Sequence, residues 1–231
     1  MVEKRTFESL GHADHGWLNA RHHFSFANYY DPARMGWGAI RVWNDDEIAP
    51  NSGFPPHPHR DMEIITYVRK GAITHKDSMG NTGRTEAGDV QVMSAGAGVQ
   101  HSEWNADDET CQLFQIWILP REQGGQPGWG TRQFPKGDRS GKWTVFAAKD
   151  GEDDALPLKQ DARVMGATLC SGDTLDYQVA PGRHGYLVLA AGSISLNGQV
   201  LKARDGAAIT GAETLSLKSI EDAEIVFVDT I

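Results

Sequence analysis

Two short segments of the chain carry residue types that bind metal ions, at a spacing suited to an extended backbone. His57 and His59 lie two residues apart, and so do His101 and Glu103. In a strand, residues i and i+2 point to the same face. Each segment therefore predicts a two-residue clamp, that is, two side chains on one face of a strand that can bind the same metal ion. If the two segments face each other, three imidazoles and one carboxylate converge on one point.

The donor atoms of these clamps indicate a site for chemistry rather than a structural zinc site. Only two cysteines occur, Cys111 and Cys170, and they are too far apart to provide the clustered thiolates of a structural zinc centre. Imidazole and carboxylate suit Fe(II), Mn(II), Co(II), Ni(II), Cu(II) and Zn(II) alike. We therefore expect one divalent metal ion per chain, and the residues alone leave its identity open.

The clamps lie among segments that are predicted to be strands. Runs of β-branched and aromatic residues alternate with polar ones and are separated by Gly, Asn and Asp. The expected strands are 37–44, 62–69, 72–77, 90–93, 99–104 and 111–119, followed by 143–148, 164–170, 174–179, 186–191, 193–197, 207–210, 214–217 and 225–228. Strands at this spacing, without helical crossovers, predict an all-β fold of two antiparallel β-barrel or jelly-roll domains.

The two strand series are separated by a stretch of different composition. Gly124-Gly125 and Pro127-Gly128 begin a loop-rich segment. We therefore expect an N-terminal metal-binding domain over 1–125, a linker over 126–142 and a reduced C-terminal domain over 143–231. The C-terminal series keeps a single histidine, His184, so it is not expected to repeat the metal site.

Composition and charge argue against several other classes of protein. Of 231 residues, 39% are hydrophobic and 23% are charged, which excludes a disordered polymer. The net charge of −9 disfavours direct binding to nucleic acid. No apolar run approaches the roughly 18 residues that span a bilayer, and the first residues lack the apolar stretch of a secretory signal. With so few cysteines, a cytoplasmic location is expected.

Several motifs give the sequence a clear resemblance to the pirin family of the cupin superfamily. They are His22–Phe26 (HHFSF), His57–Glu63 (HPHRDME), Asp77–Asn81 (DSMGN), Met93–Gly98 (MSAGAG), His101–Asn105 (HSEWN) and Gln115–Ile118 (QIWI). The resemblance is strong over residues 5–120 and weaker beyond. It implies a bicupin fold with metal only in the N-terminal barrel. It also implies Fe(II) as the usual metal, held by His57, His59, His101 and Glu103.

The sequence departs from the general cupin pattern in ways that bear on the ligands. Gly53 lies closer to His57 than is usual in cupins, and Ser94 stands where proline is common. Cupins in general use the glutamate of the first motif, here Glu63, whereas pirins use Glu103. The shared face with His101 favours Glu103. Glu63 also lies an even number of residues from His59, so it stays an alternative ligand; its other role would be a hydrogen-bond acceptor that orients a ligand histidine.

The resemblance also implies two alternative functions. Bacterial pirins are similar to quercetin 2,3-dioxygenases, which open flavonols with O₂ and release carbon monoxide. In that reading Glu103 takes the proton of the substrate hydroxyl. The alternative is a redox-sensing, metal-containing regulator that binds a transcription factor or an enzyme. In either case we expect a monomer without membrane attachment.

Overall fold

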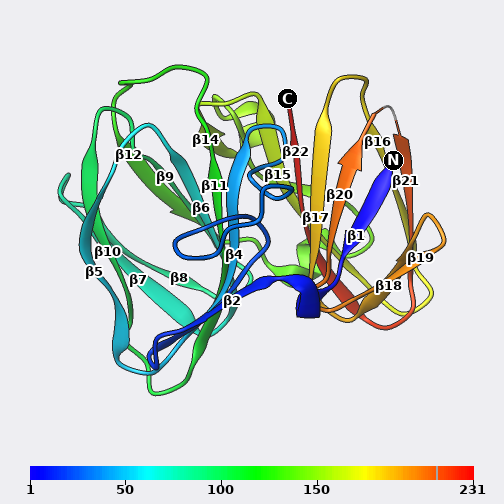
Figure 1. Ribbon diagram of the computed structural model, residues 1–231, viewed down its shortest axis with the longest axis horizontal. Coiled ribbons are helices and arrows are strands. Elements are labelled where there is room, and N and C mark those ends of the chain that lie inside the picture. Colours follow the sequence, from blue (N-terminus) through cyan, green and yellow to red (C-terminus); the bar gives the residue numbers. More distant parts are fainter. Residues whose placement is uncertain (212) are drawn as a thin grey trace.

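The computed structural model describes residues 1–211 and 213–231, and it consists of two β-rich halves that lie side by side (Figure 1). Apart from strands, the described residues form three short 3-10 helices, namely η1 (Phe7–Ser9), η2 (Lys136–Arg139) and η3 (Glu152–Asp154). No helix among the described residues has the length and apolar character needed to cross a membrane. The predicted all-β fold of two antiparallel halves is confirmed.

The N-terminal half consists of a seven-stranded and a four-stranded antiparallel sheet. The larger sheet has the order β12 (Gly128–Arg132), β9 (Val90–Ser94), β6 (Glu63–Lys70), β11 (Cys111–Ile118), β4 (Ile40–Ile48), β3 (Leu18–His22) and β2 (Gly11–Asp14). The smaller sheet has the order β5 (Ser52–His59), β10 (Val99–Asn105), β7 (Ala72–Asp77) and β8 (Thr82–Glu86).

The C-terminal half repeats this arrangement of seven and four strands. Its larger sheet has the order β1 (Val2–Arg5), β20 (Gly206–Thr210), β17 (His184–Ala191), β22 (Ala223–Thr230), β15 (Ala162–Leu169), β13 (Thr144–Lys149) and β14 (Leu156–Leu158). Its smaller sheet has the order β16 (Thr174–Val179), β21 (Glu213–Ser219), β18 (Ser193–Leu196) and β19 (Gln199–Lys202). The pair β13 and β14 is parallel.

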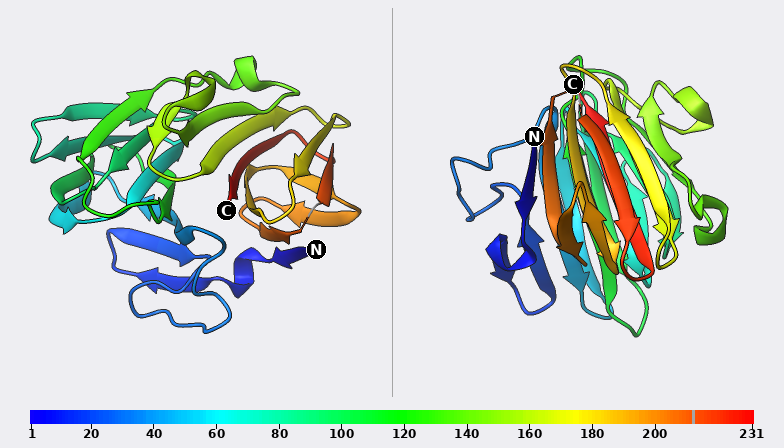
Figure 2. Two further views of the ribbon diagram at one scale, coloured as in Figure 1. Left: turned by 90° about the horizontal axis from the view of Figure 1, so that it is seen from above. Right: turned by 90° about the vertical axis from the view of Figure 1, so that its right-hand side faces the viewer.

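Two segments belong to sheets that the expected domain boundaries would not give them. Strand β1 pairs with β20, so the first residues of the chain extend the C-terminal sheet, as Figure 2 shows. Strand β12 comes from the segment predicted as a linker, and it pairs with β9 of the N-terminal sheet. The domain boundaries at 125 and 143 remain predictions. The pairings of β1 and β12 show that both segments are built into the sheets, so β12 does not form part of a flexible linker.

The two seven-stranded sheets pack against each other through one apolar cluster. Trp43 and Phe114 belong to the N-terminal sheet, and Phe146, Tyr186 and Val226 to the C-terminal sheet. All five side chains are fully buried. Large aromatic side chains bury about 150–250 Å² each, so this interface contributes strongly to the stability of both halves.

A buried ionic cluster connects the linker to both halves. Arg139 of η2 donates from Nη2 to Glu224 Oε1 at 2.9 Å and to the Tyr67 hydroxyl at 2.7 Å. Tyr67 in turn donates to Glu224, and Lys136 Nζ lies 2.7 Å from Glu224 Oε2. Arg139 is 1% exposed, so Glu224 is the carboxylate that compensates a buried charge.

Replacing Glu224 with Gln is predicted to lower the free energy of unfolding by about 3 kcal/mol, because the buried Arg139 guanidinium then loses its hydrogen-bonded carboxylate. Urea unfolding followed by tryptophan fluorescence measures the change. The control is Lys136→Ala, whose side chain is 45% exposed and whose loss is expected to cost less than about 1 kcal/mol. Equal losses in the two variants would contradict the assignment.

Candidate metal centre

Strand pairing brings the two predicted clamps together. Strands β5 and β10 are antiparallel, and His101 lies directly opposite His57 in their register. The pairing shifts between His101 and Glu103, which marks an irregularity of the bulge type at the site. Strand β5 is an edge strand, and for this reason it accommodates Pro55, Pro56 and Pro58, which have no N–H to donate to a neighbour.

Three of the four predicted ligands form one group. The nitrogen donors of His57, His59 and His101 all lie within 4.8 Å of one another. The Nε2 atoms of His57 and His101 are 3.1 Å apart. Two nitrogens bound about 2.1 Å from one ion at octahedral or tetrahedral angles lie roughly 3.0–3.4 Å apart. The spacing of these two donors therefore fits a shared metal ion.

Burial keeps two of these imidazoles in the neutral form that binds metals. Burial, reinforced by the neighbouring His57, lowers the pKa of His59 to about 4. Burial and the same neighbour lower the pKa of His101 to about 3. Both rings are therefore uncharged at neutral pH, and their nitrogen lone pairs are available to a cation.

For His57 and His101, hydrogen bonds determine which ring nitrogen carries the proton and which is free to bind a metal ion. His57 Nδ1 lies 2.7 Å from the carbonyl oxygen of Pro55, so Nδ1 carries the proton and Nε2 is the free donor. His101 Nδ1 lies 3.4 Å from His75 Nδ1, and His75 Nε2 lies 3.0 Å from Asp77 Oδ2. Since Asp77 accepts the Nε2 proton of His75, His75 Nδ1 is free to accept from His101, and His101 Nε2 is left for the metal.

This chain of contacts is itself rigidly held. His75 is fully buried and stacks on Trp129, with ring centroids 4.8 Å apart and planes 7° from parallel. The Asp77 carboxylate also accepts hydrogen bonds from the backbone N–H of Met79 and from Asn81. His75 and Asp77 lie outside the predicted ligand set, although their i, i+2 spacing on a strand was an available signal.

Glu103 lies beside the histidines in a polar centre. Its Oε1 accepts from Gln91 Nε2 at 2.7 Å and from Thr66 Oγ1 at 3.1 Å, and its Oε2 accepts from Gln115 Nε2 at 2.6 Å. Burial raises the pKa of Glu103. The group of donors within 4.8 Å contains the three histidines and not this carboxylate, so the role of Glu103 as a fourth ligand remains a prediction.

The polar centre interrupts an otherwise apolar interior. Along β6, Thr66 lies between Ile64 and Val68, which belong to separate apolar clusters. Along β11, Gln115 similarly follows Leu113 on the same face. This polar centre was not predicted, although polar residues at alternating positions within apolar strands are a sequence signal for it.

The other residues considered as ligands or ligand partners lie elsewhere. Glu63 accepts from Ser94 Oγ at 2.7 Å and from the backbone N–H of Lys159 at 3.1 Å. Among the described residues its contacts do not include the three histidines, so the predicted orienting role has no contact to support it. His184 lies on β17 in the C-terminal half, next to Trp37.

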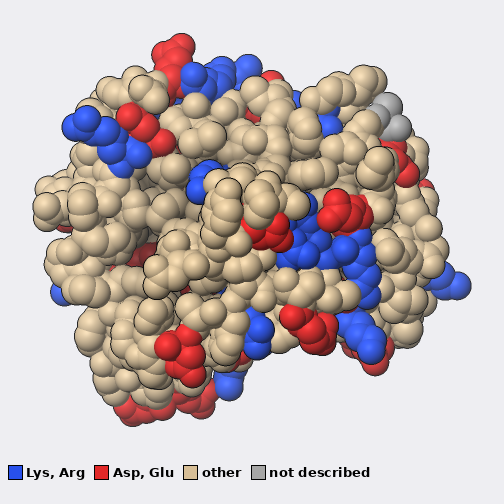
Figure 3. Space-filling view, viewed as in Figure 1, with Lys and Arg blue, Asp and Glu red and all other residues tan. Residues whose placement is uncertain are grey.

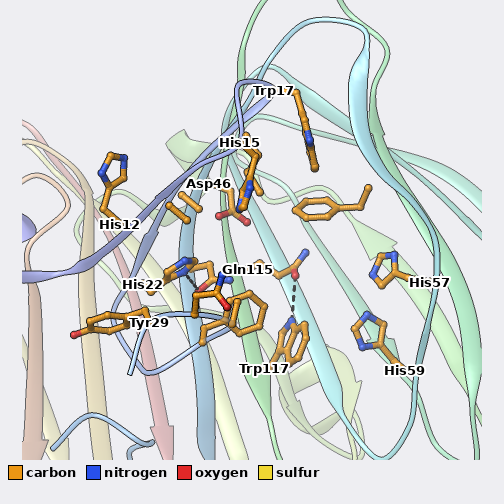
Figure 4. Close-up of a pocket in the computed structure, with 18 residues that line it drawn as sticks. His12, His15, Trp17, His22, Tyr29, Asp46, His57, His59, Gln115 and Trp117 are labelled. Carbon is orange, nitrogen blue, oxygen red and sulfur yellow. Dashed lines mark hydrogen bonds between the residues drawn. The ribbon is translucent and has the colours of Figure 1, made fainter. Parts of the chain in front are cut away.

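A cavity of about 590 Å³ opens onto His57 and His59, two of the predicted metal ligands (Figure 4). His57 and His59 line one side, and His12, His22 and Tyr29 line the opposite side. The other lining residues include four aromatic ones, Trp17, Phe26, Phe54 and Trp117, and the polar residues Asn44, Asp46 and Gln115. The His59 ring meets the Trp117 ring edge-on at 5.0 Å. The cavity suits a flat apolar ligand that presents polar atoms to the histidines.

Replacing His59 with Ala is predicted to reduce the bound metal by at least about tenfold, because one of three converging imidazoles is lost. Elemental analysis after loading with Ni(II) and desalting measures the metal content. His184→Ala serves as the control and is expected to retain one ion per chain. Full occupancy in His59→Ala, or half occupancy in His184→Ala, would contradict the site.

Replacing His75 with Phe tests the contact that orients His101. The phenyl ring preserves stacking on Trp129 but accepts no hydrogen bond, and the affinity for Ni(II) is expected to fall about 10- to 100-fold. Isothermal titration calorimetry measures this affinity. The control is Thr74→Val, which lies on the other face of the same strand. An unchanged affinity in His75→Phe would remove His75 from the site.

Comparisons with known proteins identify the family of both halves. Residues 3–118 match the Pirin family, and residues 145–230 match the family described as quercetinase C-terminal cupin domain. The chain is 61% identical over 230 residues to a pirin-like protein of Caulobacter vibrioides, with 99% of both chains covered. It is 41% identical to a quercetin 2,3-dioxygenase of Escherichia coli, with 99% of this chain and 98% of the relative covered.

A solved structure shows the same fold. The bacterial pirin YhhW of Escherichia coli, in complex with nickel(II), superimposes with a TM-score of 0.94 at 39% identity. The match covers 100% of this chain and 99% of the other. The bicupin fold is thereby confirmed, as is the assignment of the resemblance: the chain belongs to the pirin family.

Proposed function

We propose that the protein is a metal-dependent dioxygenase that opens flavonols such as quercetin with O₂. The observation that carries this proposal is the aromatic-rich cavity of about 590 Å³ that opens onto His57 and His59, two of the three converging imidazoles. Relatives named quercetin 2,3-dioxygenase support the choice of substrate. The nickel(II) complex of a related pirin supports a divalent ion in this fold. The proposed metal is Fe(II), as the family resemblance implies.

The residues proposed to hold the ion are His57, His59, His101 and Glu103. When bound, the ion would lower the pKa of a ligated substrate hydroxyl and hold the substrate oxygens in place. The histidines contribute fixed geometry, because the Pro55 carbonyl orients His57 and His75 orients His101.

Glu103 is proposed to accept the proton of the substrate 3-hydroxyl. Burial raises the pKa of its carboxyl group, which brings it closer to the working pH of a general base. The Gln91 amide donates a hydrogen bond to Glu103 Oε1, and the Gln115 amide donates one to Glu103 Oε2. These donors keep the carboxylate in position while its protonation state changes.

The cavity walls are proposed to bind the flavonol rings and to exclude water. Trp17 and Phe54 pack edge-to-face at 5.0 Å, and Phe26 packs against Trp117 at 5.4 Å. Figure 4 shows Trp17 and Trp117 on opposite sides of the cavity. Two aromatic walls on opposite sides suit a planar ligand and leave little room for solvent around its reacting ring.

The alternative function is a redox-sensing regulator that binds a protein partner. The net charge is −9, and on the face shown in Figure 3 the basic side chains are interspersed with acidic ones. This distribution suits a protein partner better than a nucleic acid. The enzyme is preferred because a concave, aromatic-rich cavity at the histidines suits a small ligand better than a protein surface.

Glu103→Gln is predicted to slow quercetin oxygenation by about 10²- to 10⁴-fold while the protein stays folded, because the amide cannot accept a proton. The reaction consumes one O₂ and releases one carbon monoxide per quercetin, so an oxygen electrode and gas analysis of the Fe(II)-loaded protein measure it.

The control is Glu63→Gln, which lies away from the histidines and is expected to keep near wild-type turnover. Wild-type rates in Glu103→Gln, with a loss in Glu63→Gln, would transfer the role to Glu63. Absence of turnover in the wild-type protein with any of the divalent metals, together with metal-dependent capture of a regulator, would support the alternative function.

A further inference from the structure

We infer that Asp46 recognises a hydroxyl group on the part of the substrate that lies away from the metal-binding oxygens. Asp46 would then select polyhydroxylated flavonols over flavonols that carry only the 3-hydroxyl and its neighbouring carbonyl. This inference rests on the proposed function and adds a residue that determines which flavonol is bound.

The side chains of Asp45 and Asp46, which are adjacent on strand β4, point to opposite faces of the sheet. Asp45 is fully buried and pairs with two guanidinium groups, those of Arg69 and Arg204, the latter at 2.5 Å. Asp46 points the other way and lines the cavity that holds His57 and His59 (Figure 4). Side chains alternate along a strand, so the two carboxylates enter separate environments.

Asp46 lacks the partners that a buried carboxylate normally has. The residue is 2% exposed, and within the described part of the chain no group donates a hydrogen bond to its buried Oδ1. Two other polar residues that line the cavity are engaged. Asn44 Oδ1 lies 2.8 Å from His22 Nδ1, and Gln115 bonds both Glu103 and Trp117. Asp46 Oδ1 is therefore a buried acceptor in this cavity that has hydrogen-bonding capacity to spare.

A ligand hydroxyl is the group that fits this position. An unsatisfied buried polar group costs free energy, and a phenolic O–H donated by the ligand removes that cost on binding. Burial and the nearby Asp45 and Glu103 charges also raise the pKa of Asp46, in keeping with the missing partner. The surrounding aromatic walls favour a phenol over a charged ligand. A site with a buried polar group of this kind rejects analogues that lack the matching hydroxyl.

The test compares two flavonols that share the metal-binding oxygens. Quercetin carries further hydroxyls on its other rings, and 3-hydroxyflavone carries none. Binding to Ni(II)-loaded protein without O₂ is followed by quenching of tryptophan fluorescence. The wild type is expected to prefer quercetin by roughly tenfold or more, and Asp46→Leu is expected to abolish that preference while binding 3-hydroxyflavone undiminished. Asp46→Asn keeps an accepting oxygen and should restore part of the preference.

A second measurement separates recognition from a structural role. Asp46→Leu removes an unpartnered buried carboxyl, so its melting temperature is expected to rise by about 2 °C or more. Asp45→Asn is the matched control. It removes a paired carboxylate, so its melting temperature should fall, while the ratio of the two flavonol affinities stays unchanged.

The outcomes distinguish the inference from the proposed function. If the wild type binds and opens quercetin but Asp46→Leu keeps the preference, the inference about Asp46 fails alone. A lower melting temperature in Asp46→Leu, or equal loss of both flavonols, would give Asp46 a structural role and also overturn the inference. If the wild type neither binds nor opens quercetin, the inference and the proposed function fail together.

Discussion

The antiparallel register of β5 and β10 is the constraint on which the site depends. It places His101 opposite His57, and the two-residue period of the strand then adds His59 on the same face. A shift of one residue in this pairing would turn the histidines of one strand away from those of the other. The prolines of β5 restrict it to the edge of the sheet, where its histidines stay partly open to the cavity.

The two halves show how one architecture serves two purposes. Inside the C-terminal half, the space between the sheets is filled by apolar residues such as Leu187, Leu215 and Phe227. At the corresponding depth, the N-terminal half holds Glu103 and its amide partners. A buried polar network persists only when its members satisfy one another, and here that requirement fixes the position of the proposed base. The apolar half contributes stability through the shared interface.

The sequence predicted much of this arrangement, and the reasons for the gaps are physical. Alternating strands and the i, i+2 histidine spacing are local signals, so the all-β fold and the three-histidine group followed from them. The positions of β1 and β12 were not foreseen, because which sheet a strand joins depends on contacts between distant segments. The role proposed for Asp46 could not be predicted from the sequence either, because only the structure shows that both Arg69 and Arg204 pair with Asp45.

The central claim, that one ion is held where the three imidazoles converge, is tested most directly by anomalous X-ray scattering from crystals of the metal-loaded protein. The account predicts a single strong peak within about 2.3 Å of the free nitrogens of His57, His59 and His101, with the Glu103 carboxylate completing the ligand set. A peak elsewhere in the chain, or none at this position in metal-saturated crystals, would contradict it.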